Sequence, residues 1–216
     1  VDPHFARTRL LALENTWHGR PLPLAYLGAA HDLARKHGLG LHLDGARLFN
    51  AAVACDVPAR EITRHFDTVS ICLSKGLGAP VGSVLVGSSA LIDKARRWRK
   101  VCGGGWRQAG ILAAGGLHAL DHHVARLVED HRRAAYLAGR LREIAGIDLL
   151  GQHTNMVFID VPAARLRELD AHLRQAGIRI SIGYLPTLRL VTHLDIDDAG
   201  IERAVAAFQA FFARRA

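Results

Sequence analysis

Residues 41–47 read LHLDGAR, and residues 68–78 read TVSICLSKGLG. Each stretch begins as an apolar run of strand length and ends in a charged side chain beside glycine, Asp44 in the first and Lys75 in the second. Continuous apolar runs are typical of strands that a parallel sheet buries on both faces. Because ligands bind at the carboxyl ends of such strands, the pattern predicts that Asp44 and Lys75 face one crevice.

Strands and helices alternate around these two stretches. Leu27, Ala30 and Ala34 recur at helical spacing, and Gly38 ends that pattern. We also expect strands at residues 10–13 and 84–86, a helix at 46–54, a helical turn opened by Pro58, and a helix from Ser88 or Ser89 to about Lys100. The alternation predicts the α/β class, with a mostly parallel sheet and helices on both faces.

The second half of the chain has its own pattern of elements. A stripe of apolar residues begins near Val124 on a long helix that Gly146 ends. We expect a strand at 156–161, a helix at 163–175, short strands near Ile178 and at 188–191, and a closing helix that carries Ile201, Val205 and Phe208. The sequence predicts a larger domain at residues 1–123 and a smaller C-terminal α/β domain at residues 124–216.

The composition fits a globular protein with a real core. The 216 residues are 50% apolar, 22% charged and 6% aromatic, and charged residues or histidine interrupt every hydrophobic stretch. No run approaches the roughly 20 apolar residues of a bilayer-spanning helix, so no membrane contact is expected. The three cysteines, Cys55, Cys72 and Cys102, are an odd number without CxxC spacing, which argues against a disulfide framework and favours the cytoplasm.

The net charge of +8 raises the question of nucleic acid. The basic residues are spread over several predicted helices, and neither a zinc finger nor an aromatic RNA-binding strand is present. We therefore expect no nucleic-acid partner. His122, His123 and His131 lie on predicted helix without an HExxH motif, so they are interpreted as surface or packing residues and no metal site is predicted.

An aspartate and a lysine at one sheet edge suit a particular chemistry. The amine of Lys75 can bind an aldehyde as a Schiff base, and a carboxylate such as Asp44 can keep a pyridine nitrogen protonated, as pyridoxal phosphate requires. The Ser74 hydroxyl is suited to phosphate, whereas the Walker lysine motif and GxGxxG are absent. The alternative interpretation is that Asp44 caps a helix and Lys75 is a surface charge.

The sequence also resembles a known family. Its matching segments are HFART at 4–8, LENT at 13–16, LHLDGAR at 41–47, ICLSKGLGAPVGS at 71–83, RWRK at 97–100, GGGWRQ at 103–108 and RLVTHLD at 189–195. In this order they resemble the low-specificity L-threonine aldolases, in the β-eliminating lyase group of fold type I pyridoxal-phosphate enzymes. The resemblance covers essentially all of the chain, which is similar to the C-terminal two-thirds of the enzyme.

The resemblance implies a role for each matching residue. Lys75 matches the lysine that binds the cofactor aldehyde, Asp44 matches the aspartate at the pyridine nitrogen, and Ser74 is expected near the phosphate. Arg47 and Arg189 match arginines that hold the substrate carboxylate, a role suited to the guanidinium group. The other expected site residues are His4 near the substrate β-hydroxyl, and Lys100 and Arg107 near the cofactor or in the site of a neighbouring subunit.

The function implied is cleavage of L-threonine or L-allo-threonine to glycine and acetaldehyde, by a homodimer or homotetramer. Two alternatives stay open: another fold type I lyase acting on β-substituted amino acids, and a truncated, non-catalytic remnant. The family's N-terminal segment, with its phosphate-binding turn and its ring-stacking histidine, has no match here. A parallel sheet without those strands is expected to expose an edge and an apolar face.

Overall fold

The computed structural model describes residues 2, 4–182 and 187–214. The chain forms two compact units, Val1–Ala125 and Arg126–Ala216. The assignment of these units to a cofactor-binding large domain and a small domain stays a prediction.

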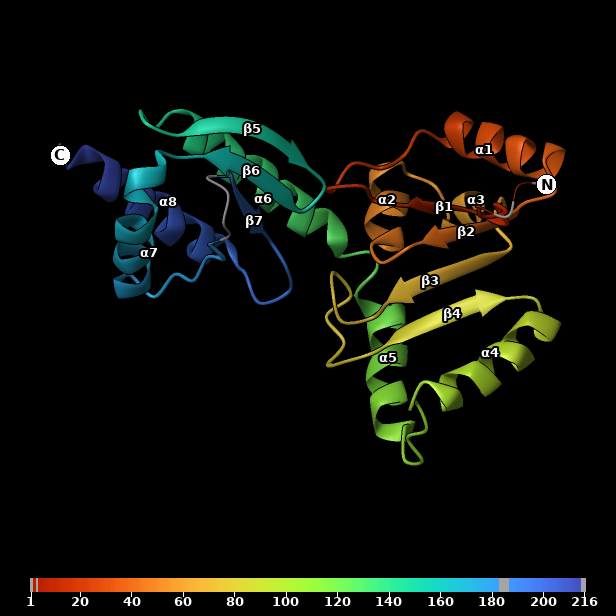
Figure 1. Ribbon diagram of the computed structural model, residues 1–216. Helices are drawn as coiled ribbons and strands as arrows, with labels where there is room; N and C mark the ends of the chain where they lie inside the picture. The colour runs from red at the N-terminus through yellow and green to blue at the C-terminus, as the bar shows by residue number, and fades with distance from the viewer. Residues whose placement is uncertain (1, 3, 183–186, 215–216) are drawn as a thin grey trace. The chain divides into compact units, whose positions relative to one another are not determined.

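The first unit contains a four-stranded sheet in the order β1-β2-β3-β4 (Figure 1). The strands are β1 (Leu10–Glu14), β2 (Gly40–Asp44), β3 (Thr68–Cys72) and β4 (Ser83–Gly87). β2 is parallel to both β1 and β3, while β4 is antiparallel to β3. The predicted α/β class with a mostly parallel sheet is therefore confirmed.

Five helices belong to this unit: α1 (Leu24–Lys36), α2 (Leu48–Ala54), α3 (Ala59–Thr63), α4 (Ser89–Val101) and α5 (Gly110–His122). On α1 the buried residues are Leu27, Ala30 and Ala34, as their helical spacing predicts. Leu27 packs in one cluster with residues of β2, α2, α3 and β3. α4 begins where the Ser88 hydroxyl accepts a hydrogen bond from the Leu91 amide at 3.4 Å.

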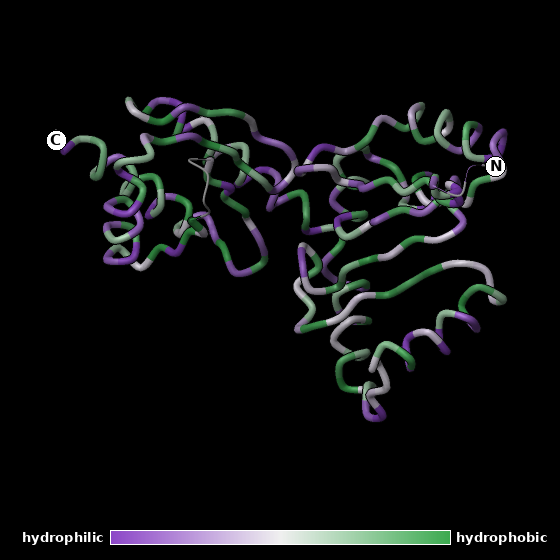
Figure 2. The backbone as a smooth tube through the Cα atoms, viewed as in Figure 1, coloured by the Kyte–Doolittle hydropathy of each residue, from purple (hydrophilic) through white to green (hydrophobic). Residues whose placement is uncertain are grey.

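β4 exposes much of its apolar surface. Figure 2 shows hydrophobic residues along this strand, and Val84, Leu85 and Val86 are 42%, 41% and 47% exposed. Among the described residues β4 is an end strand of the sheet. The exposed edge and apolar face expected from the sequence are both present here.

The second unit contains an antiparallel sheet in the order β5-β6-β7. Its elements are α6 (Leu127–Arg142), β5 (Asp148–His153), β6 (Met156–Asp160), the short 3-10 helix Ala163–Arg165, α7 (Leu166–Gln175), β7 (Thr187–Val191) and α8 (Asp198–Ala213). The helices and strands share one core, in which Leu141, Ile159, Leu173 and Phe208 are almost completely buried. This arrangement stabilises the sheet that carries Arg189 on β7.

Two details of the second unit differ from the sequence prediction. The strand expected near Ile178 is wrong, because the Ile178 amide donates to the Leu173 carbonyl at 2.8 Å and so closes the end of α7. Gly177, with φ +77°, makes this turn possible. β5 was missed, since it contains Gly151 and polar residues and its pairing with β6 is irregular between Leu149 and Gly151.

Candidate active site

The carboxyl ends of β2 and β3 lie side by side. Asp44, the last residue of β2, is in register with Ser70 of β3, and the Gly45 amide donates to the Ser70 carbonyl at 2.8 Å. A Cβ on Gly45 would lie 3.0 Å from that oxygen, so glycine allows this close approach. Ser74 and Lys75 come directly after the same end of β3. The structure therefore brings Asp44, Ser74 and Lys75 to the edge of the sheet that the carboxyl ends of β2 and β3 form.

Neighbouring residues fix the backbone around Asp44. One carboxylate oxygen of Asp44 accepts a hydrogen bond from the Ala46 amide at 3.0 Å, and the Asp44 side chain remains exposed. Arg47 follows as the half-buried residue at the start of α2. Asn15, just beyond β1, is 1% exposed, and its backbone amide donates a hydrogen bond to the Asp44 carbonyl at 2.9 Å. Three strand ends are thus joined around the candidate carboxylate.

The loop that carries Lys75 connects β3 to β4. Lys75 and Ser74 are both exposed, and the Ser74 hydroxyl lies 3.4 Å from the Cys72 sulfur. The Gly78 amide donates to the Lys75 carbonyl at 2.9 Å, and Gly78 has φ +68°. This tight turn fixes the backbone on the carboxyl side of the lysine, and glycine adopts the required left-handed conformation without strain.

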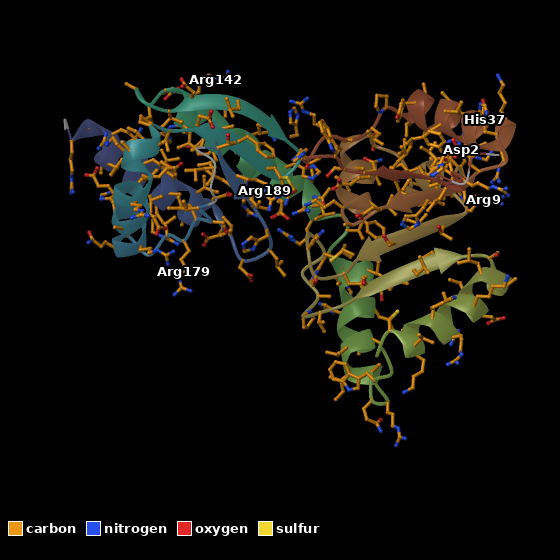
Figure 3. All side chains as sticks on the ribbon, in the orientation of Figure 1. Asp2, Arg9, His37, Arg142, Arg179 and Arg189 are labelled. Carbon is orange, nitrogen blue, oxygen red and sulfur yellow. The ribbon has the colours of Figure 1, made fainter. Side chains whose placement is uncertain are left out.

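Two other predicted residues lie outside the loops that carry Asp44 and Lys75. The ring of the exposed His4, in the segment before β1, contacts the Asp2 carboxylate at 2.7 Å. Arg189 lies on β7 of the second unit and is exposed (Figure 3). The roles proposed for His4 and Arg189 stay predictions.

Lys100 and Arg107 are both exposed and flank a turn of three glycines. Lys100 lies in the last turn of α4, and a Cβ on Gly105 would lie 2.6 Å from its Nζ, so the turn folds closely against this ammonium group. Arg107 precedes α5, whose 13 residues span about 20 Å. The loop that carries Lys75 meets α5 from Gly115 to the His123 ring, and Arg107 lies beyond the other end of this helix. Their proposed roles near the cofactor remain predictions.

Burial and hydrogen bonds change the pKa of titratable groups in other parts of the chain. Burial lowers the pKa of His131, and a hydrogen bond from the Arg35 side chain lowers the pKa of Asp67. Within the described residues, no group of three or more histidine, cysteine or acidic side chains is arranged to hold a metal ion. None of the described helices combines the length and the apolar composition needed to cross a bilayer.

The fold and this edge define the class of protein. A mostly parallel α/β sheet has its ligand side at the carboxyl ends of the strands, and here that edge carries an amine and a carboxylate. The family described as Beta-eliminating lyase matches residues 1–164. This chain therefore belongs to the beta-eliminating lyase family.

Individual relatives agree with that assignment. The low specificity L-threonine aldolase of Escherichia coli (strain K12) is 50% identical over 213 residues, which cover 99% of this chain and 63% of that protein. Low-specificity L-threonine aldolase 1 of Arabidopsis thaliana is 41% identical, over 95% of this chain and 60% of that protein. The chain thus spans less than two thirds of the length of these relatives.

Solved structures show the same fold. The threonine aldolase of Leishmania major matches with a TM-score of 0.78 at 22% identity, over 98% of this chain and 64% of that one. At 22% identity this match shows a shared fold and nothing more. It confirms the predicted architecture, of which this chain forms a part.

Proposed function

We propose that this chain supplies the lysine and the aspartate of a pyridoxal-phosphate-dependent lyase that cleaves L-threonine or L-allo-threonine to glycine and acetaldehyde. The observation that carries the proposal is the placement of Asp44 and Lys75 after adjacent parallel strands. The relatives named threonine aldolase support the substrate class. Assembly as a homodimer or homotetramer and a cytoplasmic location belong to the same proposal.

The residues at this edge fit the cofactor chemically. Lys75 offers an exposed primary amine, Asp44 offers an exposed carboxylate, and Ser74 adds a hydroxyl beside the lysine. Pyridoxal phosphate, when bound, supplies an aldehyde for the lysine and a ring that withdraws electrons from the bond being broken. The residues to hold it are therefore Lys75 at the aldehyde, Asp44 at the ring nitrogen and Ser74 at the phosphate.

The chain's own residues then have distinct tasks. The Ala46 amide donates a hydrogen bond to the Asp44 carboxylate and so orients it. Arg47, at the start of α2 and three residues after Asp44, is suited to hold the substrate carboxylate with its guanidinium group. Arg189 is proposed for the same carboxylate. His4 is proposed to lie near the substrate β-hydroxyl.

The test begins with cofactor binding. Pyridoxal phosphate is added to the 216-residue chain, the visible absorption of the lysine adduct is recorded, and borohydride reduction followed by peptide mapping locates it. We expect the adduct on Lys75, its loss in Lys75→Ala, and its retention in Lys36→Ala, which removes an exposed lysine of α1. Modification spread evenly over surface lysines would refute the proposal.

Analysis of the reaction products distinguishes the proposed aldolase from the two alternatives, a different lyase and a non-catalytic remnant. With L-threonine and bound cofactor, release of glycine and acetaldehyde supports the aldolase, whereas release of ammonia and a keto acid from a β-substituted amino acid supports a different lyase. Cofactor binding at Lys75 without turnover of either substrate supports the non-catalytic alternative.

A further inference from the structure

The lysine loop, residues 73–82, is closed by hydrogen bonds of its own backbone. The Leu73 amide donates to the Gly82 carbonyl and the Ala79 amide donates to the Leu73 carbonyl, both at 2.9 Å. Together with the turn from Lys75 to Gly78, these bonds shape the loop. These bonds lie within the loop itself, so they do not fix its position against the rest of the unit.

Helix α5 provides a surface against which the lysine loop packs. Leu73, Leu77 and Ala79 of the loop form one buried cluster with Ala119 of α5. A Cβ on Gly116 would lie 2.9 Å from a methyl carbon of Leu73. Small residues on this face of α5 therefore let the helix approach the loop closely, as Figure 1 shows for the end of α5 beside the loop that follows β3.

A polar contact joins the lysine loop to the residue that caps the end of α5. The Nδ1 atom of His123 lies 2.6 Å from the Leu77 carbonyl oxygen. A carbonyl oxygen only accepts hydrogen bonds, so Nδ1 carries the proton and donates it. The backbone of His123 is itself held at the end of α5, where its amide donates to the Ala119 carbonyl at 2.9 Å. The contact thus ties the loop, two residues from Lys75, to a fixed point on the helix.

We propose that His123 is a positioning residue for Lys75. The amine of lysine sits at the end of a flexible four-carbon chain, so the volume that it can reach is set by where the backbone holds its Cα. His123 holds the Leu77 carbonyl and thereby orders the turn that carries the lysine. The inference rests on the proposed role of Lys75 as the aldehyde-binding amine, and it adds a residue that the family resemblance did not assign.

Two substitutions separate the hydrogen bond from the packing. In His123→Asn the side-chain amide nitrogen occupies the place of Nδ1, one bond beyond Cγ, and keeps a donor there. His123→Leu keeps the apolar bulk and removes the donor. His122→Leu is the matched control, because His122 is the adjacent, exposed histidine, with a ring contact to His118.

The first measurement needs no cofactor. Amide hydrogen exchange at Gly78 and Ala79 is followed in the full chain, together with the amides of β1 and β2 as a check on the fold. Loss of one net hydrogen bond predicts exchange about ten-fold faster at Gly78 and Ala79 in His123→Leu, and near-native exchange in His123→Asn and His122→Leu. If His123→Leu does not fold, His123→Asp, which has the shape of asparagine without its donor, is compared with His123→Asn.

The second measurement is the rate at which pyridoxal phosphate forms its adduct with Lys75. We expect His123→Leu to slow this reaction and His123→Asn to restore it. Native exchange at Gly78 and Ala79 in the variants without a donor, or equal adduct rates in all variants, would overturn the positioning role. Failure of Lys75 to react in the native chain would instead refute the proposed function, while the exchange data would still decide whether His123 orders the loop.

Discussion

Replacing Asp130 with alanine is expected to destabilise the second unit strongly. Asp130 lies in the first turn of α6 with its side chain fully buried, and both of its carboxylate oxygens accept hydrogen bonds from Arg126, at 2.5 and 3.2 Å. The Arg126 side chain is itself 16% exposed. The substitution therefore leaves a largely buried guanidinium group without its counter-charge.

The size of the effect follows from this burial. Breaking a buried ion pair by removing one partner costs about 3–5 kcal/mol, and the partial exposure of Arg126 places this pair near the lower end. Asp130 also lies near the N-terminus of α6, where a negative charge adds about 0.3–1 kcal/mol. The bond from the Thr192 hydroxyl to the Asp130 carbonyl involves the backbone and survives the change. Together these contributions give an expected loss of about 3–4 kcal/mol.

The assay is urea unfolding followed by far-UV circular dichroism, with hydrogen exchange on peptides from α6 to assign the loss to the second unit. The matched control is the double variant Arg126→Met with Asp130→Leu, which replaces the pair by apolar side chains and should lie within about 1 kcal/mol of the native chain. A loss below about 1 kcal/mol for Asp130→Ala, or an equal loss in the double variant, would refute the reasoning.

Three further substitutions have defined expectations. Gly45→Ala should lower the free energy of unfolding by about 1–3 kcal/mol, because the added Cβ would press on a backbone oxygen of β3. Gly139→Ala is the control, since a Cβ there would have nothing within 4 Å, and it should be neutral or stabilising in a comparison of thermal unfolding. Burial lowers the pKa of His131 below its ordinary 6.5, so the unfolded chain binds more protons than the folded chain as the pH falls, and the folded state loses stability. His131→Gln should reduce this loss of stability between about pH 7 and about pH 5, and an unchanged pH profile of urea unfolding would contradict the prediction. Asp197→Ala removes the carboxylate that accepts a hydrogen bond from the Gly200 amide at 2.6 Å, and it should lower the stability of α8 by about 1 kcal/mol. We expect faster amide hydrogen exchange in the first turn of α8 in this variant, and native exchange in Asp197→Ser, which keeps a capping oxygen.

The first unit was largely predictable because its strands are buried runs with clear ends. β1, β2 and β3 each contain an apolar run, and the parallel order that these runs indicated places Asp44 and Lys75 at one edge. β5 carried no such signal, since it contains Gly151 and polar residues. The strand expected near Ile178 failed because its amide closes a helix end, a choice that apolarity alone does not reveal.

The sequence could not predict contacts between distant segments of the chain. His123 was interpreted as a packing or surface histidine, and its partner Leu77 lies 46 positions away. No local spacing signals a hydrogen bond of this kind, because it depends on how α5 packs against the loop.

The antiparallel pairing of β3 and β4 has a consequence for protein engineering. Both ends of the lysine-bearing connection, Cys72 and Ser83, are paired with each other in the sheet, so the connection can be lengthened without rerouting any strand. Each doubling of a flexible connection adds only about 0.6 kcal/mol of closure entropy. Peptide insertions next to Pro80 follow the Lys75–Gly78 turn and the Leu77 carbonyl, so they should yield folded protein in which the amine keeps its place.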